Sequence, residues 1–400
     1  MDRFKNGKLL KTILIVCLLC MFALIAGLSA SVVRAVTMFT AVAIGMSFDR
    51  KTMVIHSLIT SLFVLLLLKP MFLFEVGFQL SYLAVFSIVW IQPKMYNLWK
   101  PKWKLIDKFW QLFTVSSAAQ LGVLPISLFY FHQFSGLFML SNLVIIPFIG
   151  TILMGGIVVI ALSLVQMLPQ FFADGYGFII SLMNAFVSWI SEQESFLIEE
   201  ISFSFLMMLT TYLCLLLAVL FLIHKSPTRS ILLLISFVLF QSVLLYEKKR
   251  SINKQHLVIF HKSRYTVIGE RTGRALRVYY DEKTLNGQGL YMLKPYAIGE
   301  QVTSISYKQV VPSIIKILNV NLLVIDSLGI YQIKGLKNVS ILLRQSPKIN
   351  LERLLKMLIP KEVIADESNY KSLAQQWETV YKKNNIPFYY TGKYGAKILK

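Results

Sequence analysis

The first 246 residues of this 400-residue chain are dominated by long apolar runs. The clearest of these runs span residues 12–30, 53–68, 71–91, 137–165 and 203–223. As a helix, each run is about long enough to cross a hydrocarbon core of roughly 30 Å. A backbone in lipid must satisfy its own hydrogen bonds, which favours helices over isolated strands. The sequence therefore predicts a polytopic α-helical membrane bundle followed by a polar tail.

Interruptions by Lys and Arg divide the apolar region into about eight or nine predicted spans. They lie at residues 12–30, 32–48, 53–69, 71–91, 110–131, 137–165, 172–190, 203–223 and 231–246. Lys-rich and Arg-rich loops prefer the cytoplasm. If all nine segments cross, the basic connections fall on one side of the membrane and the tail falls on the other, non-cytoplasmic side.

Two of these segments have a second interpretation. Segment 137–165 contains Pro147 and is too long for one straight crossing, so a kinked or broken helix is an alternative. Segment 172–190 carries Asp174 and also fits a helix that lies along the membrane interface. If one of the two does not cross, the tail moves to the cytoplasmic side.

The charge of the chain is concentrated in the tail. The formal net charge is +21, of which residues 247–400 contribute +15 and residues 1–246 contribute +6. A basic module beside a membrane favours a polyanionic partner, either nucleic acid or anionic lipid headgroups. A basic surface that is merely solvated is the alternative.

Polar side chains inside apolar runs are costly in lipid, so they tend to face a bundle interior or a water-filled path. Five residues are candidates for lining such a path: Arg34, Glu75, Gln79, Gln120 and Asn142. Arg34 and Glu75 fall near helix ends, where pairing with each other and separate snorkelling to the interface are both open. For Gln79 and Gln120, ordinary hydrogen bonding between helices is the alternative.

Residues 249–400 predict a soluble domain of mixed α and β structure, separate from a membrane domain at 1–248. Short β-type runs occur at residues 256–261, 265–268, 275–280, 322–326, 341–343, 363–365 and 388–390. Two amphipathic helices are predicted, one capped by Asn350 and one capped by Ser368 or Asn369. The tail shows no catalytic constellation, no phosphate-binding glycine loop and no metal-ligand spacing. We therefore expect no cofactor and no enzymatic activity.

Four segments of the apolar region resemble the membrane domain of ComEC-type competence proteins. They are AGLSASVVRA at residues 26–35, FEVGFQLSYLA at 74–84, AAQLGVLP with FYFHQFS at 118–135, and SNLVIIP at 141–147. The resemblance implies a channel component of the inner (cytoplasmic) membrane for uptake of single-stranded DNA in natural transformation. It also implies a DNA-translocating motor, other competence proteins and further copies of the chain as partners.

The tail is similar to the C-terminal domain of the same family, which has a metallo-β-lactamase-like fold. ILLRQSP at residues 341–347 falls where that fold carries a His-His-Gly-Ser element, and residues 386–398 resemble its closing strands. The His-x-His-x-Asp-His metal motif is absent, so the tail is interpreted as a metal-free version without nuclease activity. The chain also starts partway through the membrane domain of the family, which suggests a fragment, a split gene or a misplaced start.

The sequence alone thus favours a protein that conducts single-stranded DNA through the lipid bilayer. A small-solute secondary transporter is the rival function, because broken helices and polar residues at mid-membrane would suit it equally well. A non-functional or split piece of a competence channel is a further alternative.

Overall fold

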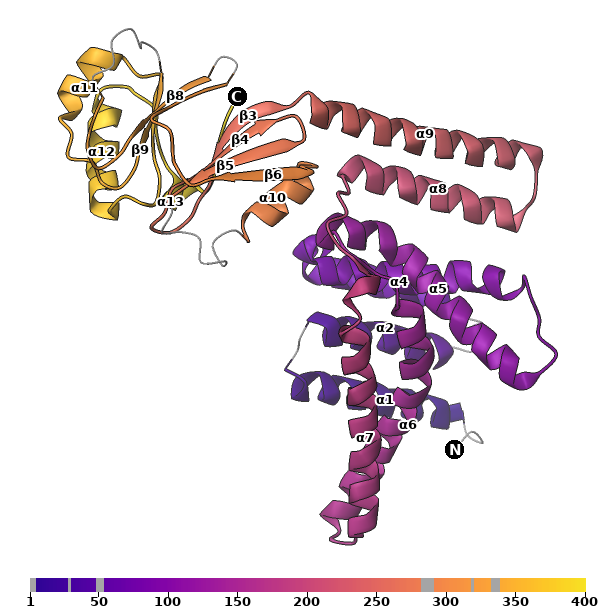
Figure 1. Cartoon of the computed structure of the whole chain (residues 1–400). Coiled ribbons are helices and arrows are strands. Elements are labelled where there is room, and N and C mark those ends of the chain that lie inside the picture. Colours follow the sequence, from indigo (N-terminus) through magenta and orange to yellow (C-terminus); the bar gives the residue numbers. More distant parts are fainter. Residues whose placement is uncertain (1–4, 28–29, 48–53, 282–290, 318–319, 332–338) are drawn as a thin grey trace. The chain divides into compact units, whose positions relative to one another are not determined.

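A computed structural model describes residues 5–27, 30–47, 54–281, 291–317, 320–331 and 339–400 (Figure 1). Contacts along the chain divide it into two compact units, Met1–Phe240 and Gln241–Lys400, and each is described by itself. The first unit is helical and the second is of mixed α and β structure. Leu28 and Ser29, in the first of the four segments singled out above, lie outside the described residues.

Every predicted span corresponds to a helix. The helices are α1 (Lys5–Ile25), α2 (Ala30–Ser47), α3 (Val54–Leu68), α4 (Val76–Tyr96), α5 (Lys104–Phe131), α6 (Phe138–Leu164), α7 (Gln170–Ser191), α8 (Phe205–Ile223) and α9 (Pro227–Ile252). Continuous apolarity over more than about 15 residues predicts helices well because lipid leaves the backbone no other local partner.

Among the described residues, six helices rather than eight or nine are long and apolar enough to cross a membrane. These are α4 to α9. The first three helices contain shorter apolar stretches, Leu10–Ile25, Val32–Ala41 and Ile55–Leu68. The chain is accordingly a multi-pass membrane protein with six candidate spans, and the larger number of crossings stays a prediction.

The two segments with a second interpretation form long helices. Helix α6 continues without interruption through Pro147, so the structure does not contain the broken helix that residues 137–165 also allowed. Helix α7 is long and apolar enough to cross, which fits a span by length and composition. It packs beside α6, where the Tyr176 hydroxyl donates a hydrogen bond of 2.9 Å to the carbonyl of Ile152.

Helices α4 and α5 approach each other closely at Gly122. A Cβ atom on Gly122 would lie only 1.8 Å from Ser87 Oγ and 3.0 Å from the carbonyl oxygen of Leu83. The Tyr212 hydroxyl of α8 donates a hydrogen bond of 3.0 Å to the Gly122 carbonyl. On the same three helices, Ile91 of α4, Ala118 of α5 and Val219 of α8 form a small apolar core. Small residues that let backbones approach are typical of helix pairs in membranes.

The second unit contains two five-stranded mixed sheets. One has the order β12-β3-β4-β5-β6 and the other has the order β11-β10-β9-β8-β7. The strands of the first sheet are β3 (Gln255–Ile259), β4 (Val267–Thr272), β5 (Ala275–Tyr280), β6 (Ser304–Lys308) and β12 (Lys397–Leu399). Those of the second are β7 (Ile314–Ile317), β8 (Val320–Ile325), β9 (Ser340–Leu343), β10 (Glu362–Ala365) and β11 (Phe388–Tyr390). In the second sheet, β8 to β11 are parallel.

Apolar side chains point alternately to the two faces of the strands, and this gives the tail four layers. In β3, Leu257 and Ile259 pack against the second sheet. Val258, which lies between them, packs toward helix α10 (Leu293–Gly299). The outer face of the second sheet packs under α11 (Leu351–Leu358) and α12 (Lys371–Lys383). Because side chains of a strand point alternately to opposite faces, one apolar run supplies two cores. The tail is an α/β/β/α sandwich.

One of the two predicted helix caps is confirmed. The Asn350 side chain accepts a hydrogen bond of 3.0 Å from the backbone N–H of Arg353, which caps α11 as expected. The predicted cap of the second helix is wrong, because α12 begins after Tyr370 and has no side-chain cap. Ser368 and Asn369 are instead used in the strand-end network described below.

Candidate functional site

Arg34 of α2 is buried inside the helical unit, with 8% of its surface exposed. Its guanidinium lies against Gly77 of α4, where a Cβ atom would be 3.5 Å from Arg34 Nη2. Its Nε is buried and has no hydrogen-bond partner among the described residues. The helical unit therefore encloses most of the Arg34 side chain.

Glu75 and Gln79 flank the same glycine on the chain, but each has its own partner. Glu75 pairs with Lys69 at 3.5 Å, and both side chains are substantially exposed. Gln79 donates a hydrogen bond of 2.8 Å to the carbonyl of Leu73, in the short 3-10 helix η1 (Pro70–Phe74). The Oε1 atom of Gln79 is buried and has no partner in the described part of the chain. The structure thus brings Arg34, Glu75 and Gln79 to one region around Gly77.

The other two predicted path residues lie on different helices. Gln120 is half-buried on α5, two residues before the close contact at Gly122. Asn142 is half-buried in the first turns of α6. No recorded interaction joins either residue to the region around Gly77 within the described ranges. The predicted role of Gln120 and Asn142 in lining a path stays a prediction.

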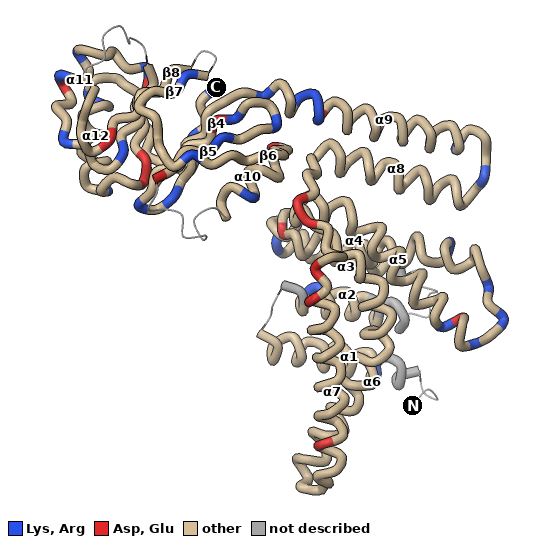
Figure 2. Tube along the Cα trace, viewed as in Figure 1, with Lys and Arg blue, Asp and Glu red and all other residues tan. Residues whose placement is uncertain are grey.

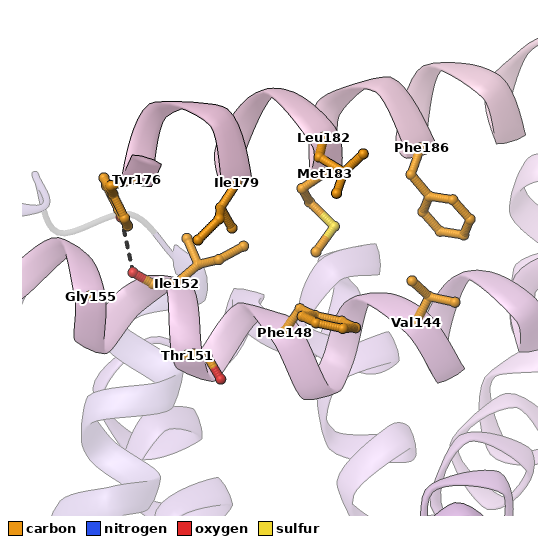
Figure 3. A pocket seen from close by; sticks show the side chains of 10 residues that line it. All are labelled: Val144, Phe148, Thr151, Ile152, Gly155, Tyr176, Ile179, Leu182, Met183 and Phe186. Carbon is orange, nitrogen blue, oxygen red and sulfur yellow. Dashed lines mark hydrogen bonds between the residues drawn. The ribbon is translucent and has the colours of Figure 1, made fainter. Parts of the chain in front are cut away.

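A large apolar cavity of about 590 Å³ lies between α6 and α7 (Figure 3). Its lining is Val144, Phe148, Thr151, Ile152, Gly155, Tyr176, Ile179, Leu182, Met183 and Phe186. No charged side chain is present in this lining, and the Tyr176 hydroxyl is already bonded to Ile152. Such a surface offers nothing to a polyanion, so we do not place a nucleic-acid path there.

Helix α7 has a polar face, which includes Asp174, Asn184 and Ser188, the polar residues behind the interfacial interpretation of segment 172–190. Gln170, Asp174, Ser181, Asn184 and Ser188 recur at intervals of three, four or seven residues, which places them along one side of the helix. All five are exposed in the isolated chain. Gln170 donates a hydrogen bond of 3.0 Å to Asp174. The sequence prediction used the presence of three of these residues, and their helical spacing adds that all five share one face.

The carboxyl ends of the parallel strands in the tail meet at a polar cluster. After β9, Arg344 Nη2 donates hydrogen bonds of 2.6 and 2.7 Å to the two carboxylate oxygens of Asp281, which follows β5. Gln345 Nε2 donates a further bond of 3.2 Å to Asp281. Arg344 is nearly buried, so the pair forms a charged centre between the two sheets. Neither residue had been singled out from the sequence as a possible partner of the other.

A second carboxylate completes this cluster after β10. Asp366 is fully buried and accepts hydrogen bonds from Thr266 Oγ1 and from Ser368 Oγ, both at 2.5 Å. Burial raises the pKa of the Asp366 carboxyl to about 6, although these hydrogen bonds oppose the rise. Ser368 Oγ and Asn369 Oδ1 also accept hydrogen bonds of 2.8 Å from the backbone N–H groups of residues 345 and 346.

The strand-end cluster does not have the composition of a metal site. In the part of the chain that the structure describes, no group of three His, Cys, Asp or Glu side chains could hold a metal ion. A guanidinium occupies the centre of the cluster, and its charge would repel a metal cation at the same place. The arrangement neutralises Asp281 and holds the loop after β9, where residues 345 and 346 have φ of 57° and 55°.

The basic residues of the helical unit lie mainly at helix ends and connections, whereas the tail carries them over many of its elements (Figure 2). Long apolar helices with a buried cation, followed by an α/β/β/α sandwich, define a multi-pass membrane protein with an attached basic domain. The sequence profile of the family described as Competence protein matches residues 1–225, and that of the ComEC C-terminal domain matches residues 257–400. The chain belongs to the ComEC family of competence proteins.

The chain is also similar to a curated protein, ComE operon protein 3 of Bacillus subtilis (strain 168). The two are 32% identical over 189 residues, which is 47% of this chain and 24% of the relative. The match thus spans about a quarter of that protein's length. No solved structure matches this chain.

Proposed function

We propose that this protein is a membrane component for the uptake of single-stranded DNA during natural transformation, in the cytoplasmic membrane. The observation that carries the proposal is the family match, which covers the helical unit and the tail in order. The six candidate spans and the buried cation at Arg34 support it, since a polyanion crossing a bilayer needs a polar and partly cationic path.

In this proposal, polar groups on several helices line the path. Arg34, Glu75 and Gln79 contribute from the region around Gly77, and Gln120 and Asn142 contribute from α5 and α6. The basic tail raises the local concentration of the strand by electrostatic attraction, which acts without base contacts. A cytoplasmic motor and further copies of the chain remain proposed partners.

The tail acts in this proposal as a metal-free relative of the metallo-β-lactamase fold and not as a nuclease. The α/β/β/α layering is compatible with that fold. The Arg344–Asp281 pair argues against a metal-dependent role, because it places a fixed guanidinium between the strand ends. Its proposed role is to bind the strand and to support the membrane unit.

The proposal predicts that loss of the gene abolishes transformation. Cells that carry a deletion should yield no transformants with linear marker DNA, and a plasmid-borne copy should restore them. Delivery of the same marker by conjugation serves as the control, since it does not use the competence route. Transformation of the deletion strain at the parental frequency would contradict the proposal.

We further propose that the tail lies on the non-cytoplasmic side, opposite the connection between α4 and α5. Single cysteines at Lys102 and Lys371, introduced after replacement of Cys17, Cys20 and Cys214, would report the two positions. A membrane-impermeant maleimide should label the Lys371 position in intact spheroplasts and the Lys102 position only after permeabilisation. Labelling of both positions from one side would show that an even number of crossings separates them.

A further inference from the structure

The side chain of Arg34 is mostly buried in the helical unit, and its guanidinium has no recorded partner among the described residues. The side chain is 8% exposed. Its Nε is shielded from solvent and makes no hydrogen bond to any residue that the structure describes. Gly77 of α4 lies against it, since an added Cβ would be in van der Waals contact with the two terminal nitrogens, at 3.5 and 3.8 Å.

The acidic residue on the neighbouring part of α4 does not neutralise this charge. Glu75, at the start of α4, is paired with Lys69 at 3.5 Å, and no ion pair to Arg34 is recorded within the described ranges. One group recorded near Arg34 is a hydroxyl. Tyr82 lies within its electrostatic range, and the Tyr82 hydroxyl is 3.2 Å from Ser61 Oγ of α3.

A buried cation without a counter-charge is strongly unfavourable, so a protein that retains one is expected to supply an anion from elsewhere. Guanidinium groups match the geometry of phosphate oxygens and form charge-assisted hydrogen bonds with them. A phosphodiester therefore has the charge and the acceptor geometry that this region lacks.

We propose that Arg34, which lies against Gly77 of α4, binds a phosphodiester anion through its guanidinium. The inference deepens the proposed function, on which it rests for the choice of the DNA strand as the source of that anion. A phospholipid headgroup presents the same chemistry and is the second source. Arg34 is thus a binding residue for the backbone of the transported strand and reads no base.

The test uses the full chain in nanodiscs of neutral lipid at fixed ionic strength. Its probes are a fluorescent single-stranded oligonucleotide with phosphodiester linkages and the same sequence with uncharged methylphosphonate linkages. Arg34→Gln should weaken binding of the first probe roughly 10- to 100-fold and leave binding of the second unchanged. The affinity of Arg34→Lys for the first probe should lie between those of the wild type and Arg34→Gln, because lysine keeps the charge but lacks the planar guanidinium.

Lys69→Gln is the matched control. It removes one positive charge from the same region, but Lys69 is exposed and paired with Glu75. Its affinity for the charged probe should stay within about twofold of the wild type, as expected for a surface ion pair. The melting temperature of Arg34→Gln should equal or exceed that of the wild type, because the substitution removes an uncompensated charge.

A second arm distinguishes the two sources of phosphodiester. Native mass spectrometry after purification from membranes would show whether phospholipid is retained. Loss of a retained anionic phospholipid in Arg34→Gln, with unchanged oligonucleotide affinity, would support the site and assign it to a headgroup. If the wild type binds no oligonucleotide, the result counts against the proposed function. The phospholipid measurement would then still show whether Arg34 binds a phosphodiester. Two results would overturn the inference: oligonucleotide and phospholipid binding that are both independent of Arg34, or, where the wild type retains no phospholipid, a lower melting temperature of Arg34→Gln.

Discussion

Replacing Arg271 by methionine is expected to lower the free energy of unfolding of the tail by about 3 to 5 kcal/mol. Arg271 lies in β4 and is fully buried. Its Nε donates a hydrogen bond of 2.9 Å to the carbonyl of Gly273, and its Nη2 donates one of 2.7 Å to the carbonyl of Glu300. The substitution removes the donor to the Gly273 carbonyl and one of the two recorded donors to the Glu300 carbonyl, the other being Ser251 Oγ at 3.2 Å.

The same arginine connects α9 to the sheet. Its Nη2 donates a hydrogen bond of 3.1 Å to Ser251 Oγ near the end of α9, and its Nη1 donates one to the carboxylate of Glu300. Lys254 binds that carboxylate at 2.6 Å. Burial alone would raise the pKa of the Glu300 carboxyl, but the hydrogen bonds from Lys254 and Arg271 outweigh it and lower the pKa below its usual value. Arg271 therefore stabilises the junction between α9 and the first sheet of the tail as well as the interior of that sheet's loops.

Pulse proteolysis of the full chain in detergent, over a urea series, would measure the effect. Arg277→Met is the matched control, since Arg277 lies in the neighbouring strand β5 with its side chain 52% exposed and paired with Glu270 at 3.3 Å. The control should change the free energy of unfolding by less than about 1 kcal/mol. Equal losses for the two variants would contradict the role assigned to Arg271.

The second large effect is expected at Gly122. Gly122→Ala should destabilise the helical unit by about 3 kcal/mol or more, because overpacking forces neighbouring backbones apart. The added Cβ would meet Ser87 Oγ at 1.8 Å and Ser87 Cβ at 2.5 Å, and no rotation of the serine moves its Cβ. The carbonyl of Gly122 would also be displaced from the Tyr212 hydroxyl, which binds it at 3.0 Å.

Abundance in membranes and thermal unfolding in detergent would measure this effect. Gly150→Ala in α6 is the control, because no atom lies within 4 Å of a Cβ built there. The double change Gly122→Ala with Ser87→Gly removes the clashing atoms and should recover most of the loss. If the single change at Gly122 is as well tolerated as that at Gly150, the close packing of α4 on α5 is not as described.

The helices were predictable because apolar length is a property of the local sequence. The strands of the tail were predicted less completely. The short β-type run at 265–268 underestimated β4, which continues to Thr272 through the buried Arg271. A charged residue in a core is not recognisable from local sequence, since its partners Ser251 and Glu300 are 20 and 29 residues away. Strand β6 was missed because its side chains are mostly exposed and show no apolar alternation.

The residues of the candidate site were also predictable by type but not by partner. Arg34 was predicted from its place in an apolar run, but its lack of a partner became visible only when Glu75 was found paired with Lys69. Ser368 and Asn369 have the chemistry of helix caps, yet tertiary hydrogen bonds to the loop at residues 345 and 346 use the same atoms. Local rules give the type of residue at such positions, and long-range contacts decide what it does.

The central claim is that this chain conducts single-stranded DNA across a bilayer, and transport into proteoliposomes tests it most directly. Reconstituted full-length protein should admit a labelled single-stranded oligonucleotide to a nuclease-protected interior, faster than duplex of the same length. The same vesicles should not accumulate small solutes such as amino acids or sugars. Accumulation of a small solute without any protected oligonucleotide would contradict the claim and favour a secondary transporter.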